Sequence, residues 1–266
     1  MVPTSTIIGM VVSMLIAVLF PILLLIYYRR NHRISWQAIG IGALVWFVFT
    51  QVLEKAMHAG VLLSTDLQSY PVWFAIYGGL AAGLFEEFGR YIAFRFWLKK
   101  RRDYLDGISY GIGHGGFEAV FIGVIGGITN FVYMALYNAG TLESTLRGKV
   151  PEETINQLTH NLTDANFFLS LVGGLERVPA VFFHIALSLL VLYGIRRGQI
   201  RFLGLAILLH AALDFCAALF AQAYGYLALT EVIVWLAGIA AVVFLFKAKS
   251  LFDRLPENGT STSAPL

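Results

Sequence analysis

Ionisable residues stand inside four long apolar stretches of this sequence. They are Glu86, Glu87 and Arg90 in the first stretch, His114 and Glu118 in the second, His184 in the third, and His210 and Asp214 in the fourth. An ionisable side chain at the centre of a membrane helix costs roughly 2.5–3.5 kcal/mol, so each of these residues needs a partner or a function. Because side chains four residues apart share one face of a helix, each stretch is expected to present one polar stripe.

The types of these residues suit the activation of water. Adjacent carboxylates at Glu86 and Glu87, with Arg90 one turn away, are typical of a general base whose neighbour holds an arginine. Histidines on the other stretches are expected either to ligate zinc or to donate hydrogen bonds to an oxyanion. The predicted zinc ligands are His114, His184 and His210. A glutamate also activates water without a metal, so the residues leave both a glutamic and a metallo-type hydrolase open.

Covalent acyl-enzyme chemistry is disfavoured. The sequence has a single, isolated cysteine, Cys216, and no Gly-x-Ser-x-Gly motif. It also has no His-Glu-x-x-His motif and no phosphate-binding glycine loop. The residues therefore indicate hydrolysis by an activated water.

Depth in the membrane indicates that the polar stripes meet. Counted from the predicted cytoplasmic ends of their helices, Glu86, Glu118, His184 and Asp214 all lie roughly 16–18 Å deep. The alternative is that each stripe is a separate ion pair within its own helix and that His184 is a satisfied core histidine. Independent pairs would have no reason to share one depth, so we expect a single site. By contrast, Glu54, Lys55 and His58 are placed at the outer end of their helix, with side chains that reach the membrane surface.

Composition identifies the elements that must position these residues. Of 266 residues, 58% are hydrophobic and 13% charged, and the mean hydropathy is +0.73, which excludes an ordinary water-soluble enzyme. We predict an all-α, polytopic bundle in the cell membrane with about seven spanning helices. They are expected at about 5–28, 36–58, 71–98, 107–138, 166–195, 202–224 and 228–247.

Basic residues are concentrated in alternate loops, which predicts an outside N-terminus and a cytoplasmic C-terminus. The short basic runs between spans explain the positive net charge, so no nucleic-acid partner is expected. The outer segment 139–165 is predicted to be an amphipathic helix or a lid-like loop. We expect one membrane domain over 1–250, with a catalytic core at about 71–224, and a polar, flexible cytoplasmic tail over 251–266.

Glycines recur at four-residue spacing in two of the predicted helices. The pairs are Gly79 and Gly83, Gly111 and Gly115, and Gly123 and Gly127. Such pairs let helix backbones approach closely in a bilayer. We therefore expect the helices over 71–98 and 107–138 to pack tightly and to bring their polar residues together.

The order of the motifs resembles the type II CAAX prenyl protease superfamily, and most closely its YhfC branch. The resemblance covers about 71–224. It rests on Glu86-Glu87-x-x-Arg90, Tyr110-x-x-x-His114 and His210-x-x-x-Asp214, and on the strings Glu-Glu-Phe-Gly-Arg-Tyr and Gly-His-Gly-Gly-Phe-Glu. It implies an intramembrane peptidase in which Glu86 or Glu87 activates water and His114 and His210 position it and bind the oxyanion.

Three positions depart from the pattern of the superfamily. Asp214 stands where asparagine is commoner, although the related PrsW proteases also have His-x-x-x-Asp. Arg90 follows Glu87 by three residues where the prenyl proteases use four. Glu118 and His184 are additional ionisable residues, which we expect to share the role of His114.

We thus predict an intramembrane endopeptidase that cleaves a peptide bond of a peptide or membrane-protein substrate in or near the bilayer. The predicted catalytic residues are Glu86, Glu87, Arg90, His114, Glu118, His184, His210 and Asp214. One alternative is a non-catalytic scaffold resembling the Aph subunit of gamma-secretase, which shares the seven-span layout but lacks the paired glutamates. Another is a proton-coupled transporter, for which an inverted repeat is expected. The sequence does not specify the substrate or the oligomeric state.

Overall fold

The computed structural model describes residues 1–256, and helices make up its regular structure. Outside the helices, the described residues contain one isolated bridge, between Arg147 and Val150. The helices are α1 (Thr4–Asn31), α2 (Trp36–Trp46), η1 (Phe47–Glu54), α3 (Lys55–Ser64), η2 (Leu67–Ser69), α4 (Pro71–Ile92), η3 (Ala93–Trp97), α5 (Tyr104–Asn138), α6 (Leu142–Leu146), α7 (Glu152–Thr163), α8 (Phe167–Leu175), α9 (Arg177–Arg197), α10 (Arg201–Ala217), η4 (Ala218–Ala223) and α11 (Leu227–Asp253). The all-α prediction is confirmed. Of the predicted tail, residues 257–266 lie outside the described residues.

Six described segments are long and apolar enough to cross a membrane. They are Thr4–Asn31, Trp36–Ser64, Tyr104–Asn138, Phe167–Arg197, Arg201–Ala221 and Leu227–Asp253. Each matches one of the predicted spans, so the chain is a multi-pass membrane protein. The remaining predicted span, 71–98, forms α4 and η3; α4 carries Glu86, Glu87 and Arg90 and is not among these six segments. A count of seven and the orientation of the termini stay predictions.

The chain divides into two compact units. The smaller unit contains residues 1–23 and 119–178, and the larger unit contains 24–118 and 179–266. In the smaller unit, α7 buries Ile155 and Leu162 and exposes acidic residues of its first turn, so the predicted amphipathic helix is confirmed. All eight predicted catalytic residues belong to the larger unit. The predicted core at 71–224 includes parts of both units.

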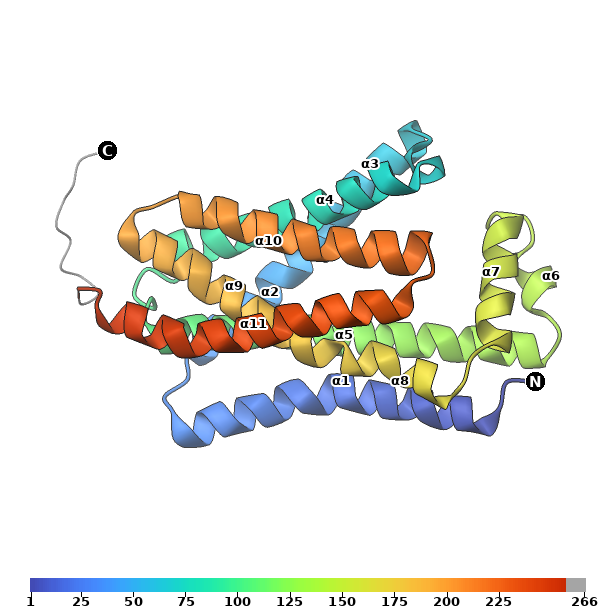
Figure 1. The fold of residues 1–266 in the computed structure, drawn as a ribbon, viewed down its shortest axis with the longest axis horizontal. Coiled ribbons are helices and arrows are strands. Elements are labelled where there is room, and N and C mark those ends of the chain that lie inside the picture. Colours follow the sequence, from blue (N-terminus) through green and yellow to red (C-terminus); the bar gives the residue numbers. More distant parts are fainter. Residues whose placement is uncertain (257–266) are drawn as a thin grey trace. The chain divides into compact units, whose positions relative to one another are not determined.

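In the larger unit, α4 packs most extensively against α10 (Figure 1). Two glycines of α4, Gly79 and Gly83, face this neighbour: a methyl group on Gly83 would lie 2.8 Å from the carbonyl oxygen of Ile207 and 3.0 Å from the nitrogen of Ala211. Side chains larger than hydrogen would therefore hold the two helices apart. We call this contact the α4–α10 seam.

A second close contact joins α5 to α9. Methyl groups on Gly111 and Gly115 would lie 2.9 Å from Cγ1 of Ile185 and 2.8 Å from Cβ of His184. The expectation that these glycines pack 71–98 against 107–138 is thus wrong, because Gly79 and Gly83 face α10 while Gly111 and Gly115 face α9. The pair at Gly123 and Gly127 belongs to the smaller unit, where it contacts α1.

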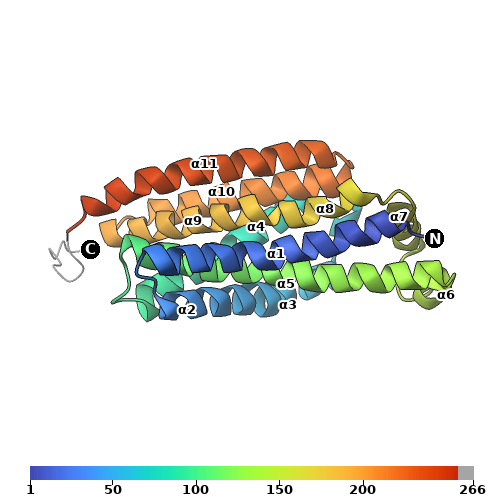
Figure 2. The same ribbon diagram turned by 90° about the horizontal axis from the view of Figure 1, so that it is seen from below.

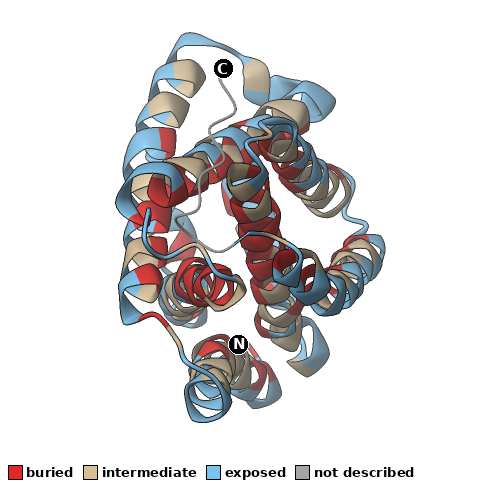
Figure 3. Ribbon diagram, turned by 90° about the vertical axis from the view of Figure 1, so that its left-hand side faces the viewer, coloured by how far each residue is buried: buried red, intermediate tan, exposed pale blue. Residues whose placement is uncertain are grey.

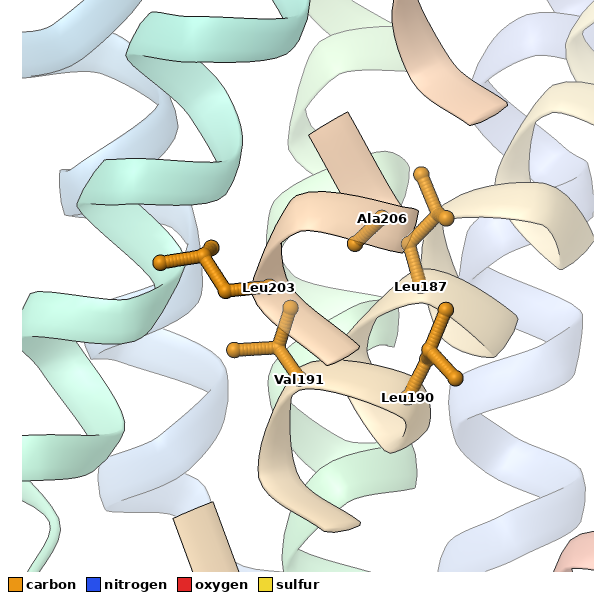
Figure 4. Close-up of a cluster of buried hydrophobic side chains, with 5 residues drawn as sticks. All are labelled: Leu187, Leu190, Val191, Leu203 and Ala206. Atoms are coloured by element: carbon orange, nitrogen blue, oxygen red, sulfur yellow. The ribbon is translucent and has the colours of Figure 1, made fainter. Parts of the chain in front are cut away.

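An apolar cluster lies between α9 and α10. It consists of Leu187, Leu190, Val191, Leu203 and Ala206, all buried (Figure 4). Figure 2 shows α9, α10 and α11 side by side, and Figure 3 shows that buried residues line the inner sides of the helices while the outer sides are exposed. The cluster fixes α9 and α10 one turn away from the histidines that these helices carry.

Candidate active site

The eight predicted catalytic residues form one layer, which we call the polar layer. Arg90 lies at its centre and is completely buried. Its Nη1 donates to Oε1 of Glu87, which also accepts a 2.8 Å hydrogen bond from Nδ1 of His210. Glu87 is itself fully buried. The α4–α10 seam explains this arrangement, since only a close approach of the two helices lets a short glutamate side chain reach a histidine on the facing helix.

The same guanidinium fixes His184 on α9. Nη2 of Arg90 lies 3.2 Å from Nδ1 of His184. A guanidinium only donates, so Nδ1 accepts and the neutral ring carries its proton on Nε2. That nitrogen lies 2.7 Å from Oε2 of Glu118 on α5. Arg90 therefore orients His184 towards Glu118.

Glu86 has a different environment from its neighbour Glu87. Its Oε2 accepts a 2.8 Å hydrogen bond from Nε2 of His114 and lies 3.8 Å from Nδ1 of His184 and 4.0 Å from Nε2 of His210. Nδ1 of His114 has no hydrogen-bond partner among the described residues. One carboxylate oxygen thus faces three histidines from three helices, while the arginine is occupied by Glu87.

Asp214 lies at the edge of the layer. Its Oδ2 is 3.5 Å from Nε2 of His210, and 39% of its side chain is exposed. All eight predicted residues therefore meet, drawn from α4, α5, α9 and α10. Separate pairs within each helix do not describe the layer: Glu87 and Arg90 do pair within α4, but their remaining contacts reach α9 and α10.

Glu54 corrects the sequence interpretation. It is buried, with 8% of its surface exposed, and it lies within electrostatic range of Asp214, His210 and Glu118. It does not extend to the membrane surface as expected. The helix predicted from the sequence ends at about 58, whereas α3 continues it to Ser64, so Glu54 lies well inside the helix and not at its outer end.

Four of these side chains have the arrangement of a metal centre. One donor atom each from Glu86, His114, Glu118 and His184 lies within 4.8 Å of the others. The predicted ligands His114 and His184 are members of this group, whereas His210 is not. Two carboxylates enter the layer here, while Arg90, the one buried arginine among residues 1–256, is paired with Glu87. Buried carboxylates need a compensating cation, so the donor set fits a divalent ion.

The fold and this layer define a multi-pass helical membrane protein with a buried glutamate–histidine centre. Residues 16–234 match the family model described as YhfC intramembrane metalloprotease, so the chain belongs to that family. It is also 36% identical over 258 residues to a Bacillus subtilis (strain 168) protein described as uncharacterized membrane protein YhfC. That match covers 95% of this chain and all of the relative. No solved structure gives a significant match.

Proposed function

We propose that this protein is a metallo-type intramembrane peptidase that hydrolyses a peptide bond in or near the bilayer, with Glu86 as its general base. The observation that carries the proposal is the position of Oε2 of Glu86, which faces His114, His184 and His210 at 2.8–4.0 Å. Hydrolysis needs a proton acceptor beside groups that hold water and stabilise an oxyanion, and this layer supplies both.

His114, His184 and Glu118 are the residues that we assign to a zinc ion. Two histidines and a glutamate are a known ligand set of catalytic zinc, which keeps a fourth position open. A bound ion would supply Lewis-acid polarisation of the carbonyl and lower the pKa of water. A neutral His184 would bind the ion through Nε2 with its single proton on Nδ1, to which Arg90 would then no longer donate. Glu86, the fourth donor, is left to handle protons.

The side chains then perform a balanced reaction. Glu86 takes a proton from water at Oε2 as the water oxygen bonds to the scissile carbonyl carbon, and the carbonyl electrons move to its oxygen. His210, held by Glu87, presents Nε2 to the same space, where in protonated form it donates to that oxyanion. When the C–N bond breaks, the electron pair stays on nitrogen, which receives the proton from Glu86.

The test is cleavage of membrane-spanning peptides by the zinc-loaded protein in liposomes. We expect a pool of single-span peptides to yield products that mass spectrometry identifies, and Glu86→Gln to reduce their rate by about 10²- to 10⁴-fold, the usual contribution of a general base. Glu153→Gln, which alters an exposed glutamate in the smaller unit, is the matched control and should leave the rate unchanged.

Thermal unfolding of both variants separates chemistry from folding. Glu86→Gln should unfold cooperatively and keep its zinc, because the three assigned ligands remain. Full activity in a folded Glu86→Gln protein would refute the assignment of the base. Absence of cleavage in the wild type across the peptide pool would instead favour a non-catalytic role.

A further inference from the structure

A chain of polar contacts leads away from the polar layer through Glu54. Oε1 of Glu54 lies 3.2 Å from Nε2 of His58, and Nδ1 of the same ring lies 2.7 Å from the hydroxyl of Tyr77. The imidazole thus bridges a buried carboxylate on η1 and a phenol on α4. At the inner end, Glu54 lies within electrostatic range of Asp214 and His210.

The chain runs towards the end of the hairpin formed by α3 and α4. His58 follows Glu54 by one helical turn in the direction of Ser64, where α3 ends. Tyr77 precedes Glu86 by nine residues, which is about 13 Å along α4 towards Pro71. Figure 1 shows α3 and α4 running together to this end.

Burial decreases from Glu54 to His58. The side chain of Glu54 is 10% exposed, whereas that of His58 is 30% exposed, and Tyr77 is half-buried. Neighbouring residues on the same helices are exposed apolar side chains: Leu53 is 43% exposed and Leu80 44%. A carboxylate, an imidazole and a phenol in contact among lipid-facing leucines are costly unless water reaches them.

Hydrolysis in a membrane also requires a supply of water to a buried layer. Each cleaved bond consumes a water molecule, while the carboxylates and histidines of the layer are enclosed by apolar helices. We propose that Glu54, His58 and Tyr77 form the hydrophilic path by which water reaches the site from the α3–α4 hairpin end. The path would supply the water that the proposed function consumes, and its role rests on that function. The access of water to the path can be measured without any substrate.

The experiment measures the reach of water by cysteine labelling. Cys216→Ala removes the only native thiol, and cysteines are then introduced singly in place of Glu54, His58 and Tyr77. A charged, membrane-impermeant methanethiosulfonate reacts with thiolate, which forms only where water is present. Leu53→Cys and Leu80→Cys are matched controls, since they lie beside the path on the same helices but face lipid.

We expect the three path cysteines to be labelled at least about tenfold faster than the two controls, because thiolate formation sets the rate. Equal rates at path and control positions would overturn the inference. If Glu54→Cys fails to fold, His58→Cys and Tyr77→Cys still decide the question. Labelled path positions in a protein that cleaves no peptide would refute the proposed function alone, and cleavage with unlabelled path positions would refute the path alone.

Discussion

Two adjacent layers of α9 and α10 differ in what holds the helices together. One layer contains His184 and His210, whose nitrogens contact charged side chains of α4 and α5 at defined distances. The next layer, about one turn away, is the apolar cluster around Leu187 (Figure 4). Directional contacts dominate the first layer and close packing the second.

The two layers therefore hold the same pair of helices together by different interactions. In a bilayer, lipid tails are as apolar as leucine, so the apolar cluster stabilises through fit alone. The polar layer is worth most when every member has its partner. Changes in the polar layer should therefore alter ion binding and chemistry, and changes in the apolar cluster should alter stability.

The largest effect is expected for a ligand of the assigned ion. Glu118→Gln should lower the apparent zinc affinity by more than about 100-fold, which exceeds the usual cost of losing an outer partner of a ligand. His210→Asn, in the same layer, should change it by less. Calorimetric zinc titration of the detergent-purified proteins, with elemental analysis, measures both. The opposite order would assign the ion to the three histidines and return Glu118 to a supporting role.

In the apolar layer, Leu187→Ala should reduce the free energy of unfolding by about 2–3 kcal/mol, because Leu187 is 2% exposed and its loss leaves a cavity. Zinc content and peptide cleavage per folded molecule should stay at the wild-type level. Reversible unfolding in detergent provides the stability. A parallel loss of zinc would show that the two layers are coupled and would contradict the separation of ion binding from stability.

The α4–α10 seam gives a smaller effect that reaches both layers. Gly83→Ala should cost about 1–3 kcal/mol of stability through overpacking, because the methyl group would press on the backbone of α10. Cleavage should also slow, as the separation draws His210 from Glu87. Gly78→Ala is the control: its methyl group would meet open space, and alanine favours a helix. Equal losses of stability in the two variants would contradict a close backbone contact at the α4–α10 seam.

The smallest effect is expected on the outer face of α10. Leu208 is 64% exposed, so Leu208→Ala should change the unfolding free energy by no more than about 0.5 kcal/mol. The same unfolding measurement applies. A loss as large as that of Leu187→Ala would indicate that a protein partner, not lipid, covers this face.

The elements and the depth of the site were predictable from the sequence. The length of each apolar stretch predicts a helix, and the cost of burying a charge identifies the residues that need partners. Together they predict one layer that contains Glu86, Glu118, His184 and Asp214. Length and depth act along the helix axis. They therefore predict the level at which residues lie.

Which helices are neighbours was not predictable in the same way. The spacing of Gly79 and Gly83 predicts a close helix contact but does not identify the neighbouring helix. By spacing alone, Arg90 could pair with either Glu86 or Glu87. The choice of Glu87, and of α10 as the facing helix, depends on contacts between segments more than 100 residues apart. Glu54 was misplaced because the predicted helix ended at about 58, whereas α3 extends to Ser64.

The polar stripe of α4 also constrains how the protein is made. Glu86, Glu87 and Arg90 leave α4 outside the group of segments apolar enough to cross a membrane by composition. During synthesis α4 precedes α9 and α10, whose histidines contact Arg90 and Glu87 of α4. Glu87 and Arg90 can pair within α4 at once, whereas their contacts with His210 and His184 form only after α9 and α10 are made. The polar layer is therefore complete only after α10 has been synthesised.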